Sequence, residues 1–301
     1  MNRRFFIRRA AVGGGLLLLP TLSRATATRT RRLTILHTND WHSRIDPFPD
    51  DGSRNANQGG AVRRFSLIRR IRSAEPNVLL LDSGDVFQGT PYFNYFLGEL
   101  EMKLMSQMGY DACTIGNHDF DGGMENLATQ AGKASFPLLN ANYGVKGTPL
   151  EGVVEPYRVF DKEGIRVGVF GLGIELDGLV PPALYAGTEY QDPVARGNLI
   201  ATELRERHRC ELVICLSHLG FRYRDGKVSD VSLAAESRNI DLILGGHTHT
   251  FLDQPVEVAN AVGEPVVINQ VGFAGLRLGR LDLTFGAAGG PQCVSCSNLR
   301  V

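Results

Sequence analysis

The chain of 301 residues is poor in cysteine, carries no net charge and contains no internal repeat or low-complexity tract. Five cysteines are too few for a small domain held together by disulfides. With 43% hydrophobic and 21% charged residues, the composition also excludes a disordered or collagen-like chain. Cys293 and Cys296 have the spacing of a metal or redox pair, but no second pair completes a zinc site. We therefore expect these two cysteines to form a disulfide or to remain as free thiols.

Residues 1–27 have the pattern of an export signal. A basic start is followed by an apolar run at residues 10–22 and by small residues at 25–27 that predict a cleavage site. The segment RRFFIR at residues 3–8 resembles the twin-arginine export motif, and an ordinary secretory signal is the alternative. A bilayer span needs about 20 apolar residues, so the shorter run predicts no stable membrane anchor. The pattern predicts a bacterial protein exported to the periplasm or the outside of the cell by the twin-arginine route.

The electrical neutrality of the chain depends on this segment, which contains five arginines and no acidic residue. Its removal would leave 27 basic and 32 acidic residues, a net charge of about −5. Proteins that bind nucleic-acid duplexes usually carry the opposite sign, so no duplex partner is expected. An anionic substrate must therefore be held by local positive charge.

Beyond residue 31, five short apolar segments each end in a cluster of Asp, Asn, His, Ser and Gly. Near-continuous apolar runs rich in β-branched residues are typical of buried strands in a parallel or mixed sheet. The predicted strands cover residues 33–38, 78–81, 112–115, 212–216 and 241–244, and the clusters that follow them are 39–42, 82–85, 116–119, 217–218 and 245–249.

Helical patterns lie between these strands, and the alternation predicts a layered α/β domain. The expected helices cover residues 61–74, 92–108, 124–133, 193–208 and 231–237. Later apolar segments separated by short turns predict a second sheet portion, with strands at 157–160, 165–170, 256–258, 266–271 and 276–285. Residues 43–60 form a long polar loop, and no linker divides residues 28–301, which we interpret as a single domain.

In open α/β sheets, ligands collect outside the carboxyl ends of the strands, so the five clusters should converge on one crevice. Carboxylate, imidazole and amide groups are ligands for divalent metal ions of intermediate hardness. Seven such ligands are too many for one catalytic ion and suit two ions that share a carboxylate. The candidate metal ligands are Asp40, His42, Asp85, Asn117, His218, His247 and His249.

A histidine or aspartate after a strand is most often a turn or cap residue. Five of the seven histidines nevertheless fall in these clusters, and scattered turn residues would not sort in that way. Residues at i and i+2 of an extended segment point to the same side. We therefore expect Asp40 with His42, and His247 with His249, to act as two pairs of ligands.

Together the clusters resemble the motifs of the calcineurin-like metallophosphoesterases, and more narrowly those of the catalytic domain of secreted bacterial 5'-nucleotidases. The resemblance rests on NDWH at 39–42, GD at 84–85, QG at 88–89, GNHDFD at 116–121, SH at 217–218 and GHTH at 246–249. Each motif alone is weak evidence for the family, but five motifs in the family's order and spacing are specific to it. The resemblance covers residues 32 to about 285. The resemblance implies a four-layer α/β/β/α sandwich with two mixed sheets.

The resemblance also implies roles for individual residues. One ion is expected to be bound by Asp40, His42 and His249. The other is expected to be bound by Asn117, His218 and His247. Asp85 is expected to bind both ions from a position between them. His118 is expected to pair with Asp121 and to stabilise charge in the transition state. Better-known nucleotidases often have Gln or Asn at the position of His249. The histidine is therefore a departure from that subgroup, and it leaves open which metal the site prefers. Asn117 and Arg44 are the candidate contacts to the substrate.

Two divalent ions and the two anionic ligands Asp40 and Asp85 would leave a local charge of +2, which can hold a phosphate. Two ions about 3.5–4 Å apart can lower the pKa of a bridging water toward about 7 and supply a hydroxide that attacks phosphorus. The predicted activity is metal-dependent hydrolysis of phosphate esters, above all nucleotides. The alternatives are a cyclic-nucleotide or nucleotide-sugar phosphodiesterase and a sulfur-oxidation thiosulfohydrolase. Manganese, iron, cobalt and zinc all suit the ligands.

Such nucleotidases usually bind the base of the nucleotide with a second domain. None of the motifs found in this sequence belongs to that domain. A separately encoded partner chain would supply nucleotide recognition, or the domain would hydrolyse small phosphoesters with little selectivity. Helical spacing predicts that most of a group of aromatic residues is buried in the core instead of forming a base-stacking platform. These residues are Phe87, Tyr92, Phe93, Tyr95 and Phe96.

Overall fold

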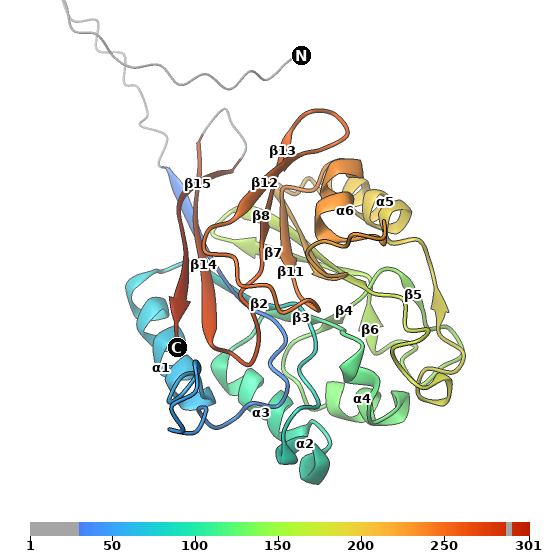
Figure 1. Cartoon of the computed structure of the whole chain (residues 1–301). Helices are drawn as coiled ribbons and strands as arrows, with labels where there is room; N and C mark the ends of the chain where they lie inside the picture. Colours follow the sequence, from blue (N-terminus) through green and yellow to red (C-terminus); the bar gives the residue numbers. More distant parts are fainter. Residues whose placement is uncertain (1–29, 287–290) are drawn as a thin grey trace, which may run out of the picture.

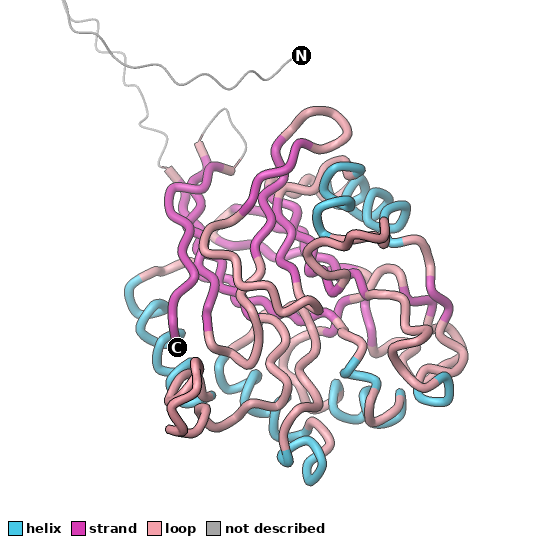
Figure 2. Tube along the Cα trace, in the orientation of Figure 1, coloured by secondary structure: helices cyan, strands magenta, loops and turns pink. Residues whose placement is uncertain are grey.

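A computed structural model describes residues 30–286 and 291–301 of the chain, in which two β-sheets pack between layers of helices (Figure 1). Figure 2 shows the strands gathered in the centre and the helices on the two outer sides. None of the helices in the described part combines the length and the apolar character that a bilayer span requires. The export signal expected at residues 1–27 lies outside the described residues and stays a prediction.

The first sheet has seven strands. The pairs from β1 to β6 are parallel, whereas β14 and β15 join one edge in antiparallel orientation, so the sheet is mixed. The order across the sheet is β15 (Gln292–Arg300), β14 (Arg277–Phe285), β1 (Arg31–Thr38), β2 (Val78–Asp82), β3 (Ala112–Thr114), β4 (Leu138–Leu139) and β6 (Val154–Glu155).

The second sheet has six strands and is mixed as well, because antiparallel strands β12 and β7 flank a parallel centre. Its order is β12 (Val256–Ala259), β13 (Pro265–Asn269), β11 (Leu242–Gly245), β10 (Leu212–His218), β8 (Ile165–Gly173) and β7 (Tyr157–Lys162). A small separate sheet pairs β5 (Tyr143–Gly144) with β9 (Glu189–Tyr190).

The helices divide between the outer faces of the two sheets. The first sheet is covered by α1 (Ala61–Ala74), α3 (Glu99–Met108) and α4 (Met124–Ala131), with the short α2 (Pro91–Phe96) beyond them. The second sheet is covered by α5 (Pro193–Glu206) and α6 (Asp230–Glu236). Two short 3-10 helices, η1 (His118–Phe120) and η2 (Pro182–Leu184), lie in connecting segments.

Three layers of buried apolar side chains hold these elements together. Ile68 of α1 and Leu80 of β2 belong to the layer between helices and first sheet. Ile35 of β1 and Ile214 of β10 meet between the sheets, and the third layer packs α5 and α6 on the second sheet. Burial of this kind contributes about 25 cal/mol per Å² of apolar surface. The three layers confirm the expected four-layer α/β/β/α sandwich.

One expected helix, at residues 92–108, is interrupted. Leu97 and Gly98 both adopt left-handed backbone conformations, with φ of 51° and 93°, which separate α2 from α3. The ring of Phe87 lies so close to the Gly98 Cα that no side chain fits there. Only glycine fits at position 98 against this ring, a tertiary contact that the helical spacing does not reveal.

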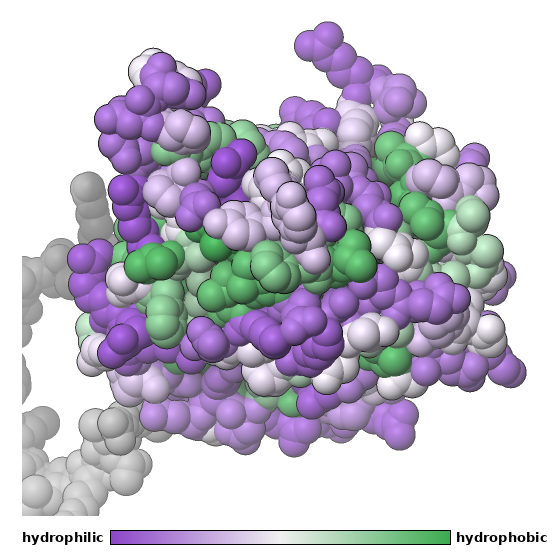
Figure 3. All heavy atoms as spheres, turned by 90° about the horizontal axis from the view of Figure 1, so that it is seen from below, coloured by the Kyte–Doolittle hydropathy of each residue, from purple (hydrophilic) through white to green (hydrophobic). Residues whose placement is uncertain are grey.

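The expectation that the aromatic residues near α2 are mostly core is wrong for part of the group. Phe87 and Phe93 are buried, but Tyr95 is 82% and Phe96 49% exposed, and Tyr92 donates a hydrogen bond to Asp46. Figure 3 looks at the molecule from the side on which α2 projects and shows apolar side chains gathered in a band across this face. The break in the helix turns this part of the group outward.

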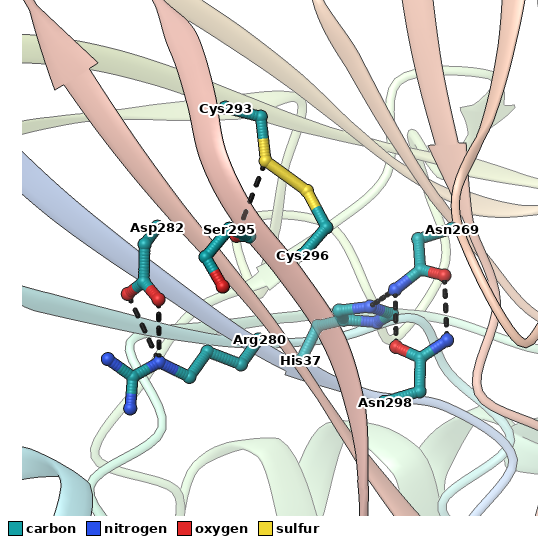
Figure 4. Close-up of a disulfide and its surroundings, with 8 residues drawn as sticks. All are labelled: His37, Asn269, Arg280, Asp282, Cys293, Ser295, Cys296 and Asn298. Atoms are coloured by element: carbon teal, nitrogen blue, oxygen red, sulfur yellow. Dashed lines mark hydrogen bonds and ion pairs between the residues drawn. A yellow bond between two sulfur atoms is a disulfide. The ribbon is translucent and has the colours of Figure 1, made fainter.

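Strand β15, which the sequence patterns did not predict, closes one edge of the first sheet and contains the disulfide between Cys293 and Cys296 (Figure 4). Asn298 of the same strand exchanges two hydrogen bonds with Asn269 of β13, at 2.8 and 3.1 Å. Asn269 also donates to Nε2 of the buried His37, at 2.8 Å. These amides connect the edge strand to the second sheet.

The two sheets approach one another closely at Gly171 of β8. A methyl group at this position would overlap the backbone carbonyl of Leu139 and the hydroxyl of Thr114, both in the opposite sheet. We expect Gly171→Ala to lower the free energy of unfolding by about 1–3 kcal/mol, because the sheets must move apart. Urea denaturation measures this change. Gly132→Ala, where the nearest atom lies at an ordinary 3.5 Å, is the control and should shift stability by no more than about 0.5 kcal/mol; equal shifts would contradict the prediction.

Candidate functional site

The carboxyl ends of strands from both sheets meet at one edge of the sandwich. Asp40 follows β1, Asp85 follows β2, and Asn117 follows β3 of the first sheet. His218 ends β10, and the loop after β11 of the second sheet carries the last two candidate histidines. The structure brings the seven candidate ligands together in two neighbouring groups, as the clusters at the strand ends predict.

The first group contains Asp40, His42 and His249, which each offer one ligand atom within 4.8 Å of the others. Nε2 of His249 lies 3.4 Å and Nε2 of His42 lies 3.9 Å from Oδ1 of Asp40. The two imidazole nitrogens are 2.9 Å apart and point toward the same place. Two ring nitrogens and a carboxylate oxygen in this arrangement can hold a divalent cation.

The second group contains Asp85, His218 and His247, and Asn117 lies beside it. Nε2 of His218 is 3.1 Å from Oδ2 of Asp85. Nδ1 of His247 is 2.9 Å from Oδ1 of Asn117, so an imidazole nitrogen and an amide oxygen face one another. This group offers the same classes of ligand atom as the first.

Asp85 faces both groups. The Oδ2 atom that approaches His218 also lies 3.8 Å from Nε2 of His42 in the first group. Its other oxygen, Oδ1, accepts a hydrogen bond of 2.8 Å from the backbone amide of His118. The side chain is almost fully buried, at 2% exposure. One carboxylate is therefore fixed between two sets of ligands, which is the position of a shared ligand.

Within the described residues, Nε2 of His218 is buried and has no hydrogen-bond partner, and that atom is the one aimed at the second group. Nδ1 of the same ring donates to the carbonyl of Ser83 at 2.7 Å, so Nε2 is the nitrogen that faces Asp85 and that a metal ion would bind in place of a proton. An orphaned ring nitrogen next to a buried carboxylate fits a metal ion. Metal ligation by histidine commonly relies on such a second hydrogen bond.

The electrostatics of the second group favour a cation. Burial opposes a charge on His218, but the facing carboxylate of Asp85 outweighs it and raises the pKa of His218 to about 10. Burial lowers the pKa of His247 to about 4, which keeps that ring neutral, as a metal ligand must be. The negative charge of Asp85 that stabilises a proton on the buried imidazole would also stabilise a metal cation at the same position.

Five of the seven candidate ligands have left-handed backbone conformations, with φ between 50° and 69°. Such conformations cost roughly 1–3 kcal/mol each in residues other than glycine and gather at functional sites. The five are Asp40, His42, Asp85, His247 and His249.

This backbone corrects the expectation of two paired ligands on extended segments. Asp40 and His42 do share a group, but His247 points into the second group and His249 into the first. The i and i+2 rule assumes an extended strand, whereas these residues have left-handed backbone. The separation of His247 from His249 is the arrangement that the family resemblance implied.

Several residues position the candidate ligands, and the sequence patterns did not single them out. Asp119 accepts hydrogen bonds from the backbone amides of residues 85, 86, 87 and 116, which fixes the loop of Asp85 against the loop of Asn117. Gln270 accepts from the amide of Thr250 and donates to the carbonyl of Gly246. Asp119 belongs to the GNHDFD motif, so the sequence could have indicated its role. Gln270 lies in no motif, so nothing in the sequence indicated its role.

His118 lies beside the first group, with its ring 5.4 Å from that of His42 between centroids. Its Nδ1 is 2.9 Å from Oδ2 of Asp121, which places this pair as the resemblance implied. The hydrogen bond with Asp121 raises the pKa of His118. Arg44 lies with its guanidinium 4.4 Å from the ring centroid of Phe48, and its contact to a substrate stays a prediction.

Comparison with known families decides the classification. Residues 33–251 match the family described as calcineurin-like phosphoesterase, and this range contains both groups of candidate ligands. The chain belongs to the calcineurin-like phosphoesterases.

The phosphoesterase is similar to 5'-nucleotidases in sequence and in structure. It is 34% identical over 282 residues to a snake venom 5'-nucleotidase of Gloydius brevicauda and 34% identical over 279 residues to the 5'-nucleotidase of Homo sapiens. These matches cover 87% and 85% of this chain but only 46% and 47% of the two relatives. A 5'-nucleotidase precursor of Thermus thermophilus superposes with a TM-score of 0.79 at 31% identity, over 90% of this chain and 55% of the other. The chain thus spans about half the length of these relatives.

Gly116 of the phosphoesterase lies against the Asp85 carboxylate, where an added methyl group would overlap Oδ1 and crowd the Asp85 amide at 2.5 Å. Gly116→Ala should therefore displace Asp85 and weaken divalent-metal binding roughly 10–100-fold, the usual effect of disturbing a ligand's support. Metal titration followed by elemental analysis tests this outcome. Gly132→Ala provides the comparison, and undiminished metal binding in Gly116→Ala would show that Asp85 has no part in holding the metal.

Proposed function

We propose that the protein hydrolyses phosphate monoesters of nucleotides at a centre of two divalent metal ions. The observation that carries the proposal is the position of Asp85, whose carboxylate faces both groups of candidate ligands at 3.1 and 3.8 Å. The relatives at 34% identity are 5'-nucleotidases, which favours a nucleotide as the substrate.

One ion would be held by Asp40, His42 and His249, the other by Asn117, His218 and His247, with Asp85 between them. When bound, the ions would neutralise phosphate charge and lower the pKa of a water molecule from 15.7 toward about 7. Asp40 and Asp85 are the two anionic ligands of this set, so two divalent cations would leave an excess of positive charge for a phosphate. Imidazole, carboxylate and amide ligands without a thiolate suit manganese, iron, cobalt or zinc.

His118 is the proposed catalytic residue beside the metal ligands. Its Nδ1 is engaged with Asp121, which orients the ring and leaves Nε2 as the group that can reach a substrate. The side chain is 37% exposed, so the ring is accessible from the solvent side of the site. His118 would donate a proton or a hydrogen bond to a phosphoryl oxygen or to the leaving group. Asn117 and Arg44 are proposed as additional contacts to the phosphate.

Export by the twin-arginine route to the periplasm is proposed with this function, on the pattern of residues 1–27. A separate partner chain that recognises the nucleotide also stays a proposal. Hydrolysis of phosphodiesters and hydrolysis of thiosulfate esters are the alternatives. The rates of hydrolysis of one substrate from each class distinguish them from hydrolysis of monoesters.

Removal of metal is the first experiment. Chelation followed by dialysis should reduce phosphate release from adenosine 5'-monophosphate roughly 100-fold or more, because the water nucleophile loses its activation. Manganese or zinc should restore the activity. Parallel assays with p-nitrophenyl phosphate, bis-p-nitrophenyl phosphate and a thiosulfate ester identify the bond that is cleaved. Full activity after exhaustive chelation would overturn the metal mechanism, and a preference for the diester or the thiosulfate ester would overturn the monoester assignment.

Replacement of His118 separates catalysis from metal binding. His118→Ala should lower kcat by a factor of about 10²–10⁴, the usual contribution of a positioned acid, while the metal content stays at the parent value. Steady-state kinetics and elemental analysis of the same preparation measure both quantities. His208→Ala is the matched control, because that histidine contacts Tyr157 on another part of the molecule. Loss of metal from His118→Ala would instead assign this histidine to the metal ligands.

A further inference from the structure

A pocket of about 240 Å³ lies directly beside the first group of candidate ligands. Its wall includes Phe273, whose ring stacks on the imidazole of His249 with a centroid distance of 5.0 Å and an angle of 13°. Phe251 forms a second aromatic wall and meets Phe273 edge to face at 5.9 Å. A single aromatic ring therefore separates this pocket from a residue of the candidate metal centre.

Three arginines line the same pocket, and no acidic side chain of residues 30–286 or 291–301 does. Arg277 of β14 and Arg300 of β15 are directly paired partners in the antiparallel ladder, so their side chains leave the sheet on the same face. Arg54 comes from the polar loop between β1 and α1. Like charges directly opposite one another on two strands destabilise a sheet.

The structure offers little to offset this repulsion. Among the described residues, the one carboxylate in an ion pair with these arginines is that of Asp253, 3.2 Å from Arg277. The Asp253 side chain is 92% exposed, and ion pairs at such positions contribute at most about 1 kcal/mol. A bound anion would offset the remaining charge, and guanidinium groups suit phosphate because they form two parallel hydrogen bonds with it.

Of the three arginines, Arg277 has its side chain fixed by neighbouring groups. Arg277 donates to the carbonyl of Leu252 at 3.3 Å, and Asn298 donates to the same carbonyl at 2.6 Å. Figure 4 shows the pair of Asn298 and Asn269 and the disulfide within β15, the strand that ends at Arg300. The edge strand is thus joined to the pocket loop and to the second sheet. Because Arg277 is positioned in advance, a ligand that binds to it loses less conformational entropy at this side chain.

The uncharged part of the pocket suits a planar ring. Phe251 packs over Gly272, where any side chain would overlap its ring, and this close contact sets the orientation of the aromatic wall. Asn55 and Gln58 place amide groups on the pocket wall, where they can bond to polar edges of a ring. Flat aromatic surfaces with nearby amides and arginines are a combination that recognises nucleobases together with phosphates.

We propose that this cationic pocket, lined by Arg54, Arg277, Arg300, Phe251 and Phe273, binds the part of the substrate that is not released. Its ligand class is a nucleotide with a second phosphate, with the base against the two phenylalanines and the second phosphate on the arginines. The inference rests on the proposed function, since it places the phosphate to be cleaved at the neighbouring metal centre. It gives the chain its own means of nucleotide selection.

The experiment compares adenosine 3',5'-bisphosphate with p-nitrophenyl phosphate, which lacks both the base and the second phosphate. The ratio of their kcat/KM values should fall at least tenfold in Arg277→Met and in Arg300→Met, mainly through KM for the bisphosphate. Methionine keeps the apolar stem of the side chain and removes only the charge. Arg54→Met, in a loop outside the sheets, is the variant to use if the strand variants do not fold.

Arg207→Met is the matched control, because Arg207, which directly follows α5, also forms one ion pair, 3.1 Å from Glu203, on the outer side of the second sheet. This variant should keep the parent ratio. Parent-like ratios in all three pocket variants would overturn the pocket assignment and leave the proposed hydrolase intact. If the parent hydrolyses no phosphoester, equilibrium titration of the chelated protein with adenosine 3',5'-bisphosphate tests the pocket alone. At least tenfold weaker binding in Arg277→Met supports the pocket, and equal binding of parent and variant overturns it.

Discussion

The carboxylate of Asp85 is the charge on which the arrangement of the site depends. It is buried at the meeting point of strands from both sheets, and an isolated buried carboxylate would be strongly destabilising. Its neighbours compensate for this: His218 and His42 face one oxygen, and the His118 amide donates to the other. The same negative charge that draws these donors inward draws metal cations, so folding and metal binding rest on one group.

The four-layer frame permits a site that is locally unfavourable. Five candidate ligands have left-handed backbone, and each such residue costs roughly 1–3 kcal/mol. Asp119 and Gln270 hold the strained loops through hydrogen bonds to backbone amides and carbonyls, and the strands below them are fixed by three apolar layers. The five left-handed ligands come from three loops, those after β1, β2 and β11, and their side chains lie in two neighbouring groups.

Local patterns predicted the elements well where one physical rule governs a segment. Helix α1 and strand β1 follow from the spacing of apolar residues, and five histidines at strand ends pointed to a metal site. Errors arose where a distant contact decides the outcome. The expected helix breaks at Leu97 and Gly98, where the ring of Phe87 leaves no room for a side chain, and His247 and His249 lie in different groups, which the i and i+2 spacing did not indicate. Strand β15 was not predicted, since its edge position leaves most of it without an apolar pattern.

The sequence alone determined that apolar strands end in carboxylate, imidazole and amide groups, because strand periodicity and ligand chemistry are properties of short segments. The family resemblance had placed Asp85 between the two sets of ligands, but only the tertiary structure decided that Asp119 supports its loop and that arginines from a loop and two strands share a pocket with Phe273. These facts depend on strand pairing and on how closely two sheets approach. Both follow from the packing of segments that are far apart along the chain, which no local pattern of residues encodes.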